Sequence, residues 1–169
     1  DDFLTKHYKK VNIIMPSQKF TMVPAPLFDP AKKDEYFTLN HNMEDGNLIL
    51  SNLISEPAAY LVFSVLKPLS DIITKYYPEV YPLHHIKPLL NHICRNRKRV
   101  HGNYIHIHIE RDFFNLIIFD HKTLNFCNTF NYRNITDIMY YVLNVFKNLG
   151  IKQEETIYFS GLTEKYDDL

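Results

Sequence analysis

The chain has 169 residues, which at roughly 100–200 residues per domain allows one domain or two small lobes that share a core. Hydrophobic residues make up 46% and charged residues 22%, a composition that disfavours the disordered and fibrous classes. Nineteen basic side chains balance nineteen acidic ones. A net charge of zero gives no overall field for polyphosphate or for an anionic membrane surface, so nucleic acid and membranes are disfavoured as partners.

Glycine, cysteine and apolar runs narrow the class further. The chain has only four glycines, although close contacts to phosphate usually need glycine backbone. Cys94 and Cys127 lie far apart without CxxC spacing, which suits a reducing cytoplasm and favours neither a zinc site nor a disulfide framework. No apolar run approaches the roughly 18 residues of a membrane span. Because the chain starts at Asp1 and ends in a charged run, we expect missing sequence at both ends.

Short strands and helices alternate in the first hundred residues. Apolar runs at 11–15 and 19–23 predict a β-hairpin or two adjacent strands. Asp29 before Pro30 predicts a capped short helix that ends near Leu39. The other predicted elements are strands at 47–54, 58–65 and 80–83 and helices from Lys67 to Pro78 and at 85–96. The strand at 58–65 is a continuous apolar run, so both of its faces should be buried.

The two predicted helices of this half are amphipathic. The apolar positions of the first are Leu69, Ile72, Ile73 and Tyr76. Because they recur at helical spacing, this face should pack inward. His84, His85 and His92 lie on or beside the second helix, where we expect a solvated surface. The basic run at 95–99 suits the negative end of that helix, so a solvated helix end is preferred over a nucleic-acid contact.

The second half predicts a sheet with one crossover helix. Residues 104–109 and 123–130 alternate between apolar and polar, and 113–119 is apolar, which together predict a three-stranded antiparallel meander. A helix should then open at Thr136 or Asp137 and close at Gly150. The last strand, at 156–160, should join the sheet parallel to the first strand through that helix.

Meander, helix and strand in this order form the ribonuclease H-like half-unit of the actin, sugar-kinase and chaperone ATPases. Three runs carry a closer resemblance: KVNIIMPSQKFTMVPAPLF, AYLVFSVLKPLSDIITKYYPEVYPLHHIKPLL and YIHIHIERDFFNLIIFDHKTLNFCNTFNY. Together they resemble a bacterial family catalogued as domain of unknown function 3822, and the actin-like ATPase superfold of pilus-assembly and type II secretion scaffold proteins. The resemblance implies an α/β fold with an incomplete first lobe at 1–100, which lacks its first phosphate hairpin, and a nearly complete second lobe at 101–169, truncated at its end.

The resemblance also places a phosphate loop after the first strand of the second lobe. An active actin-like ATPase has an Asp-Ile-Gly pattern there, but its Asp position falls on His108 and its Gly position on Glu110. Asp112 adds a second carboxylate, and carboxylates repel a triphosphate where donors are needed. The glycines on the adenosine side are reduced to Gly161. We therefore expect that this segment binds no ATP, and we expect no cofactor.

His106 and His108 are two residues apart on the predicted strand, which puts both imidazoles on one face with Tyr104 and Glu110. Such an HxH pair can ligate zinc when a third ligand arrives from elsewhere. It can also form a hydrogen-bonded, pH-sensitive contact. The preferred interpretation is the polar face of a strand whose isoleucines, Ile105, Ile107 and Ile109, fill the core.

Catalytic signatures are otherwise scarce. Glu110, Asp112, Asp120 and Asp137 are carboxylates in or near the meander, but two-metal nucleases of this fold need an acid inside the first strand, where histidines stand. The sequence shows no Ser-His-Asp pattern, nucleophile elbow, Walker loop or GxGxxG fingerprint. Two functions remain: a catalytically silent scaffold that binds protein, with a homodimer as the simplest partner, and a nucleotide-binding ATPase whose cleft is completed by residues absent from this chain.

Overall fold

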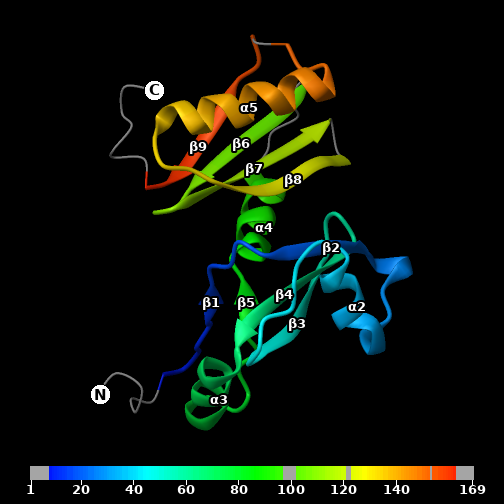
Figure 1. The fold of residues 1–169 in the computed structure, drawn as a ribbon, viewed down its shortest axis with the longest axis vertical. Coiled ribbons are helices and arrows are strands. Elements are labelled where there is room, and N and C mark those ends of the chain that lie inside the picture. Colours follow the sequence, from blue (N-terminus) through cyan, green and yellow to red (C-terminus); the bar gives the residue numbers. More distant parts are fainter. Residues whose placement is uncertain (1–7, 97–101, 121–122, 153, 163–169) are drawn as a thin grey trace. The chain divides into compact units, whose positions relative to one another are not determined.

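The computed structural model describes residues 8–96, 102–120, 123–152 and 154–162. The chain divides into two compact units, Asp1–Asn96 and Arg97–Leu169, and each unit has strands and helices of its own (Figure 1). The mixed α/β class predicted from the sequence is confirmed. The boundary predicted at residue 100 lies outside the described residues.

A three-stranded antiparallel sheet dominates the first unit. Its order is β2 (Phe20–Pro24), β4 (Ala59–Leu66) and β3 (Asn47–Ile54). The central strand β4 is buried on both faces, as its apolar run predicted, since Leu61, Val62 and Phe63 are inaccessible to solvent. One face is covered by α2 (Lys33–Thr38), whose Phe37 packs on the sheet.

The connection from β2 to α2 begins with two short 3₁₀ turns, η1 (Ala25–Leu27) and η2 (Pro30–Lys32). The Asp29 carboxylate accepts the Ala31 N–H at 2.9 Å. This bond confirms the predicted cap at Asp29, with Pro30 at the first position of the turn. This cap satisfies a donor that would otherwise lack a partner at the start of the turn.

The first strand pairs elsewhere in the unit. β1 (Ile14–Met15) lies parallel to β5 (Leu83–His84), and the Leu83 N–H donates to the Ile13 carbonyl at 2.8 Å. The two strands predicted at 11–15 and 19–23 are present as β1 and β2, but they do not form a hairpin, because β2 pairs instead with the long buried strand β4. β5 also begins three residues later than predicted. Asn52 bridges the two sheets: its side chain accepts the His84 N–H at 2.7 Å and donates to the Pro82 carbonyl at 3.1 Å.

The two predicted helices of this unit are present, but their surroundings differ from the expectation. In α3 (Lys67–Tyr76) only Ile73 is buried, whereas Leu69, Ile72 and Tyr76 are 38–47% exposed. The apolar face therefore packs inward at one position. In α4 (Ile86–Asn96) the apolar face is buried as predicted through Ile86, Leu90 and Ile93.

The histidines beside α4 also depart from the expectation. His84 and His85 are buried, whereas His92 is exposed. The solvated surface predicted for all three is wrong for the first two, because β5 carries His84 into the contact between the two sheets and places its ring 5.0 Å from those of Phe20 and Phe63.

The second unit is the predicted four-stranded sheet, with order β8-β7-β6-β9. Its antiparallel meander consists of β6 (Asn103–Ile109), β7 (Phe113–Asp120) and β8 (Thr123–Asn131). β9 (Ile157–Gly161) pairs parallel with β6, which confirms the crossover connection. The register sets Ile105 opposite Ile157 and His108 opposite Ser160.

One helix, α5 (Ile135–Leu149), covers one face of this sheet (Figure 1). The side chain that caps it is Asn134, which accepts the Asp137 N–H at 3.2 Å. The predicted start at Thr136 or Asp137 is therefore one to two residues late. Gly150 ends the helix in the left-handed region at φ 66°, as predicted. Beneath α5 the three isoleucines of β6 are buried, which leaves the histidines on the opposite face.

Candidate functional site

The polar face of β6 meets the last strand at a serine. His106 Nε2 and His108 Nδ1 each lie 2.8 Å from the Ser160 Oγ. The other ring nitrogen of His108, Nε2, lies 3.2 Å from the Glu110 Oε1. We call these four residues the Ser160 cluster: a carboxylate, an imidazole, a hydroxyl and a second imidazole in one hydrogen-bonded chain.

Sequence reasoning found the histidines and the glutamate but missed the serine. No local motif marks Ser160, since its neighbours in sequence are Phe159 and Gly161. The signal that could have found it is the predicted parallel pairing of the first and last strands, because a parallel register brings a β9 side chain beside the β6 histidines. That register was not fixed by the sequence pattern.

Two tyrosines border the cluster on the same face. The rings of Tyr104 and Tyr158 stack with centroids 4.5 Å apart and planes 13° from parallel, and the Tyr104 ring also lies 6.3 Å from that of His106. Burial, with a smaller contribution from Tyr158, raises the pKa of Tyr104 above its usual value. The Tyr104 phenol therefore stays neutral, and the two stacked rings form an aromatic wall.

The turn after β6, where a phosphate loop would lie, uses its backbone groups internally. The Glu110 N–H donates to the Phe113 carbonyl at 2.9 Å. The Glu110 carbonyl accepts the Tyr132 hydroxyl at 2.7 Å, and the Asp112 carbonyl accepts the Tyr132 N–H at 3.2 Å. The Glu110 donor is therefore committed to the hairpin, and the exposed side chains of the turn include the Asp112 carboxylate.

Gly161 is required by strand pairing. Its φ is +89°, and a Cβ built there would lie 2.1 Å from the Ile109 carbonyl oxygen. The next residue, Leu162, donates its N–H to that same oxygen at 2.8 Å. The glycine thus lets β9 approach the end of β6, which explains its presence without a nucleotide.

A family model described as "Protein of unknown function (DUF3822)" matches residues 1–169. The chain belongs to this family. A solved structure from Bacteroides thetaiotaomicron VPI-5482, described as a protein with actin-like ATPase fold and unknown function, is similar over 98% of this chain at 26% identity, with a TM-score of 0.89. The fold is therefore actin-like, as predicted. The chain covers 65% of that protein, just under two thirds of its length. A search of curated proteins found no match.

The metal alternatives for this DUF3822 member gain no support from the geometry. Within the described ranges, no three His, Cys, Asp or Glu side chains are grouped so that they could hold a metal ion. His106 Nε2 and His108 Nδ1 both face the Ser160 hydroxyl. The Asp137 carboxylate accepts the Arg133 N–H at 2.8 Å, beside the start of α5. Asp120 lies at the far end of β7 from the 110–112 turn.

The remaining sequence candidates are only partly described. Arg95 lies in the last turn of α4, as predicted, while the rest of the basic run, 97–99, lies outside the described residues. Cys94 and Cys127 lie in different units, and burial raises the pKa of the Cys127 thiol to about 12. No described helix has the length and apolar character to cross a membrane.

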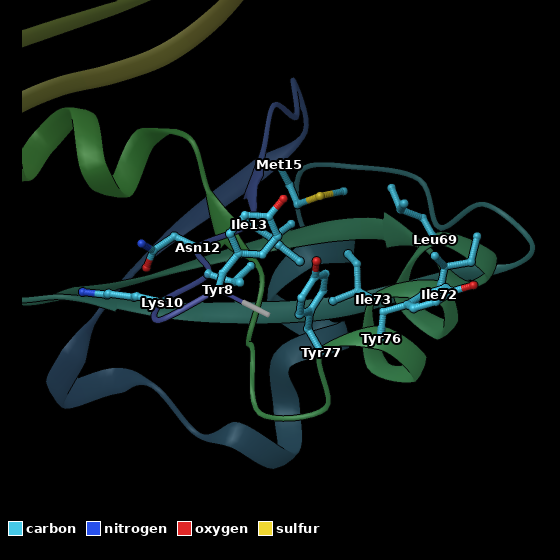
Figure 2. A pocket seen from close by; sticks show the side chains of 11 residues that line it. Tyr8, Lys10, Asn12, Ile13, Met15, Leu69, Ile72, Ile73, Tyr76 and Tyr77 are labelled. Atoms are coloured by element: carbon cyan, nitrogen blue, oxygen red, sulfur yellow. The ribbon is translucent and has the colours of Figure 1, made fainter. Parts of the chain in front are cut away.

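An apolar groove on the first unit is the other notable surface of this DUF3822 member. It lies between α3 and the segment that leads into β1 and has a volume of about 490 Å³ (Figure 2). Its apolar lining includes Val11, Ile13, Met15, Leu69, Ile72, Ile73 and Tyr76. The exposed face of α3 thus forms one wall, which explains why three of its apolar positions are not buried.

Proposed function

We propose that this DUF3822 member is an actin-like protein that does not hydrolyse ATP and acts by binding another protein. The observation that carries the proposal is the turn at 110–112. In the nucleotide-dependent alternative, backbone donors of this turn would have to reach phosphate. Here the Glu110 N–H is bonded within the hairpin, and two carboxylates stand where a triphosphate would bring negative charge.

We expect the chain to bind no ATP in the presence of magnesium. Isothermal titration calorimetry should show only heats of dilution, because the turn offers carboxylates in place of donors. The Asp112→Ala variant tests the reason, and Asp34→Ala, an exposed aspartate of α2, serves as its control. Micromolar affinity in the wild-type chain would contradict the proposal, and its loss in Asp112→Ala but not in Asp34→Ala would place the binding at this turn and favour the ATPase alternative.

The protein-binding surface that we propose is the groove of Figure 2. Its walls are apolar, and exposed apolar surface of this kind marks interaction sites. Lysines border the groove. Lys10 lines it, and Lys9, the preceding residue, is exposed. The Lys75 Nζ lies 5.4 Å from the centre of the ring of Tyr76, another lining residue. A symmetric contact with a second copy would bring together two surfaces that both carry lysines, which like charge disfavours. We therefore assign the groove to an amphipathic helix whose polar edge carries Asp or Glu.

A labelled 18-residue helical peptide with leucines at i, i+3, i+4 and i+7 and flanking glutamates is the probe. By fluorescence anisotropy, Ile72→Asp should weaken its binding at least about tenfold, because a carboxylate enters the apolar wall. Tyr140→Asp, at an exposed aromatic of α5, should leave binding unchanged.

The same peptide with lysines in place of the glutamates should bind more weakly, and the difference should shrink at high salt. Equal binding of both peptides, or no effect of Ile72→Asp, would contradict the assignment. Light scattering across a dilution series tests the homodimer alternative: a concentration-dependent dimer that Ile72→Asp dissociates would show that the groove is a self-contact.

A further inference from the structure

The Ser160 cluster has the composition and order of an activated nucleophile: a hydroxyl bonded to an imidazole whose other nitrogen faces a carboxylate. We propose that Ser160 is the nucleophile of an acyl-transfer site that accepts carboxylic esters with an apolar acyl group. His108 acts as its general base, and Glu110 positions that imidazole. Such sites are recognised by geometry and roles, on many unrelated folds, rather than by sequence order.

One assignment of protons satisfies the three hydrogen bonds of the cluster when Glu110 is ionised and His108 is neutral. A carboxylate only accepts, so the His108 nitrogen that faces Glu110, Nε2, carries the proton. The other nitrogen of the neutral ring, Nδ1, is then an acceptor, and the Ser160 hydroxyl must donate to it. Having donated its proton, that oxygen can only accept from His106 Nε2. The serine proton is therefore already directed at the base.

The cluster lies where an ester can reach it. Among the described residues β9 is the last strand at its edge of the sheet. The side chain of His108 is 20% exposed, that of Glu110 32% exposed, and Ser160 is half-buried. On the same face, Tyr158 is 39% exposed and stacks on Tyr104. This aromatic wall beside the hydroxyl is the reason for assigning an apolar acyl group.

The reaction balances with ester and water alone. As the Ser160 Oγ attacks the carbonyl carbon, the O–H bond breaks and its proton moves to His108 Nδ1. Collapse of the tetrahedral intermediate breaks the ester C–O bond, and the leaving alkoxide takes the proton from His108. Water then attacks the acyl carbon while His108 Nδ1 takes its proton. Collapse of the second tetrahedral intermediate releases the carboxylic acid, and the Ser160 oxygen takes the proton back from His108. Glu110 keeps its charge and stabilises the imidazolium.

A fluorescent fluorophosphonate is the probe for this site. Attack by the Ser160 Oγ forms an O–P bond, expels fluoride and leaves the proton on His108, so labelling requires the nucleophile and the base but no deacylation. We expect intact-mass and peptide analysis to place one label on Ser160. His108→Gln should slow labelling about a hundredfold, the usual contribution of a general base. Glu110→Gln should slow it at least about tenfold, and Glu110→Asp should restore part of the rate.

Controls separate chemistry from folding and from the groove. Ser64→Ala, which removes a half-buried strand serine of the first unit, should leave labelling unchanged, and circular dichroism should show that each variant stays folded. Labelling of Ser160 no faster than that of Ser64, or a rate unaffected by His108→Gln, would overturn the inference. Ile72 lies in the first unit, so Ile72→Asp should leave the labelling of Ser160 unchanged. The labelling test and the peptide-binding test can therefore fail separately.

Discussion

Replacing Gly161 with alanine is expected to detach β9 from β6 and to lower the free energy of unfolding of the second unit by about 3 kcal/mol. Two effects combine. The backbone at φ +89° is one that side chains with a Cβ rarely adopt, and the new methyl group would lie 2.1 Å from the Ile109 carbonyl oxygen. Because that oxygen belongs to the backbone of a buried strand, the two strands must separate to admit the methyl group.

Gly150→Ala supplies the matched control in the same unit. Gly150 also has a positive φ, 66°, but a Cβ there meets nothing within 4 Å. It should therefore show the conformational penalty alone, about 1–2 kcal/mol. Denaturant unfolding gives the two free energies, and hydrogen exchange at the β9 amides shows where protection is lost. Equal losses in both variants would mean that the approach of Gly161 to Ile109 is unimportant.

Acidification is expected to destabilise the first unit through one histidine, His84. Both ring nitrogens of its neutral form are used: Nδ1 accepts the Ile86 N–H at 3.3 Å, and Nε2 donates to the Ser17 carbonyl at 3.1 Å. Burial, followed by the nearby His85, lowers the pKa of His84 to about 3. Protonation would place a charge among the rings of Phe20, Phe63 and His85.

The loss of stability at low pH follows from the uptake of a proton by the unfolded chain. Below an unfolded pKa of about 6.5 the unfolded chain takes up a proton at His84, whereas the folded chain does not until about pH 3. Stability from this group is therefore complete above pH 6.5 and falls by about 1.4 kcal/mol per pH unit as the pH drops towards 3. Between pH 6.5 and 4.5 the expected loss is about 2–3 kcal/mol.

Guanidinium unfolding at intervals from pH 8 to 4.5 measures this slope. His84→Gln should be less stable at pH 7, because the buried site is disturbed, yet its stability should fall less steeply with acid by one proton. His92→Gln, at an exposed histidine of α4, should keep the full slope. Parallel curves for wild type and His84→Gln would show that His84 is protonated in the folded chain.

Local sequence patterns predicted the elements of the second unit well, but they did not predict which strands pair in the first unit. The alternation at 104–109 and the glycine at 150 act within a few residues, so the meander and the end of α5 followed from sequence. Pairing of β1 with β5 instead of β2 depends on residues far along the chain. The burial of His84 follows from that same pairing, which no periodicity encodes.

The same distinction between local pattern and distant strand pairing applies to the candidate site. The face shared by His106, His108 and Glu110 follows from the period of a strand. The serine that joins them comes from a strand about fifty residues later, at a separation of 52 from His108. Its exact register depends on the close approach at Gly161, a steric detail that hydrophobic patterning does not carry.

The pairing of β1 with β5 has a consequence for how this family can vary. Ser17 and His85, which are 68 positions apart, are joined by a hydrogen bond at 3.4 Å. The segment that contains the β2-β4-β3 sheet and α3 therefore begins and ends at this contact within the first unit. The entropy of closing a loop grows only slowly with its length, by about 0.6 kcal/mol per doubling. Insertions or deletions in the exposed loops of this segment should therefore be tolerated, provided that the Asn52 side chain keeps its bonds to His84 and Pro82.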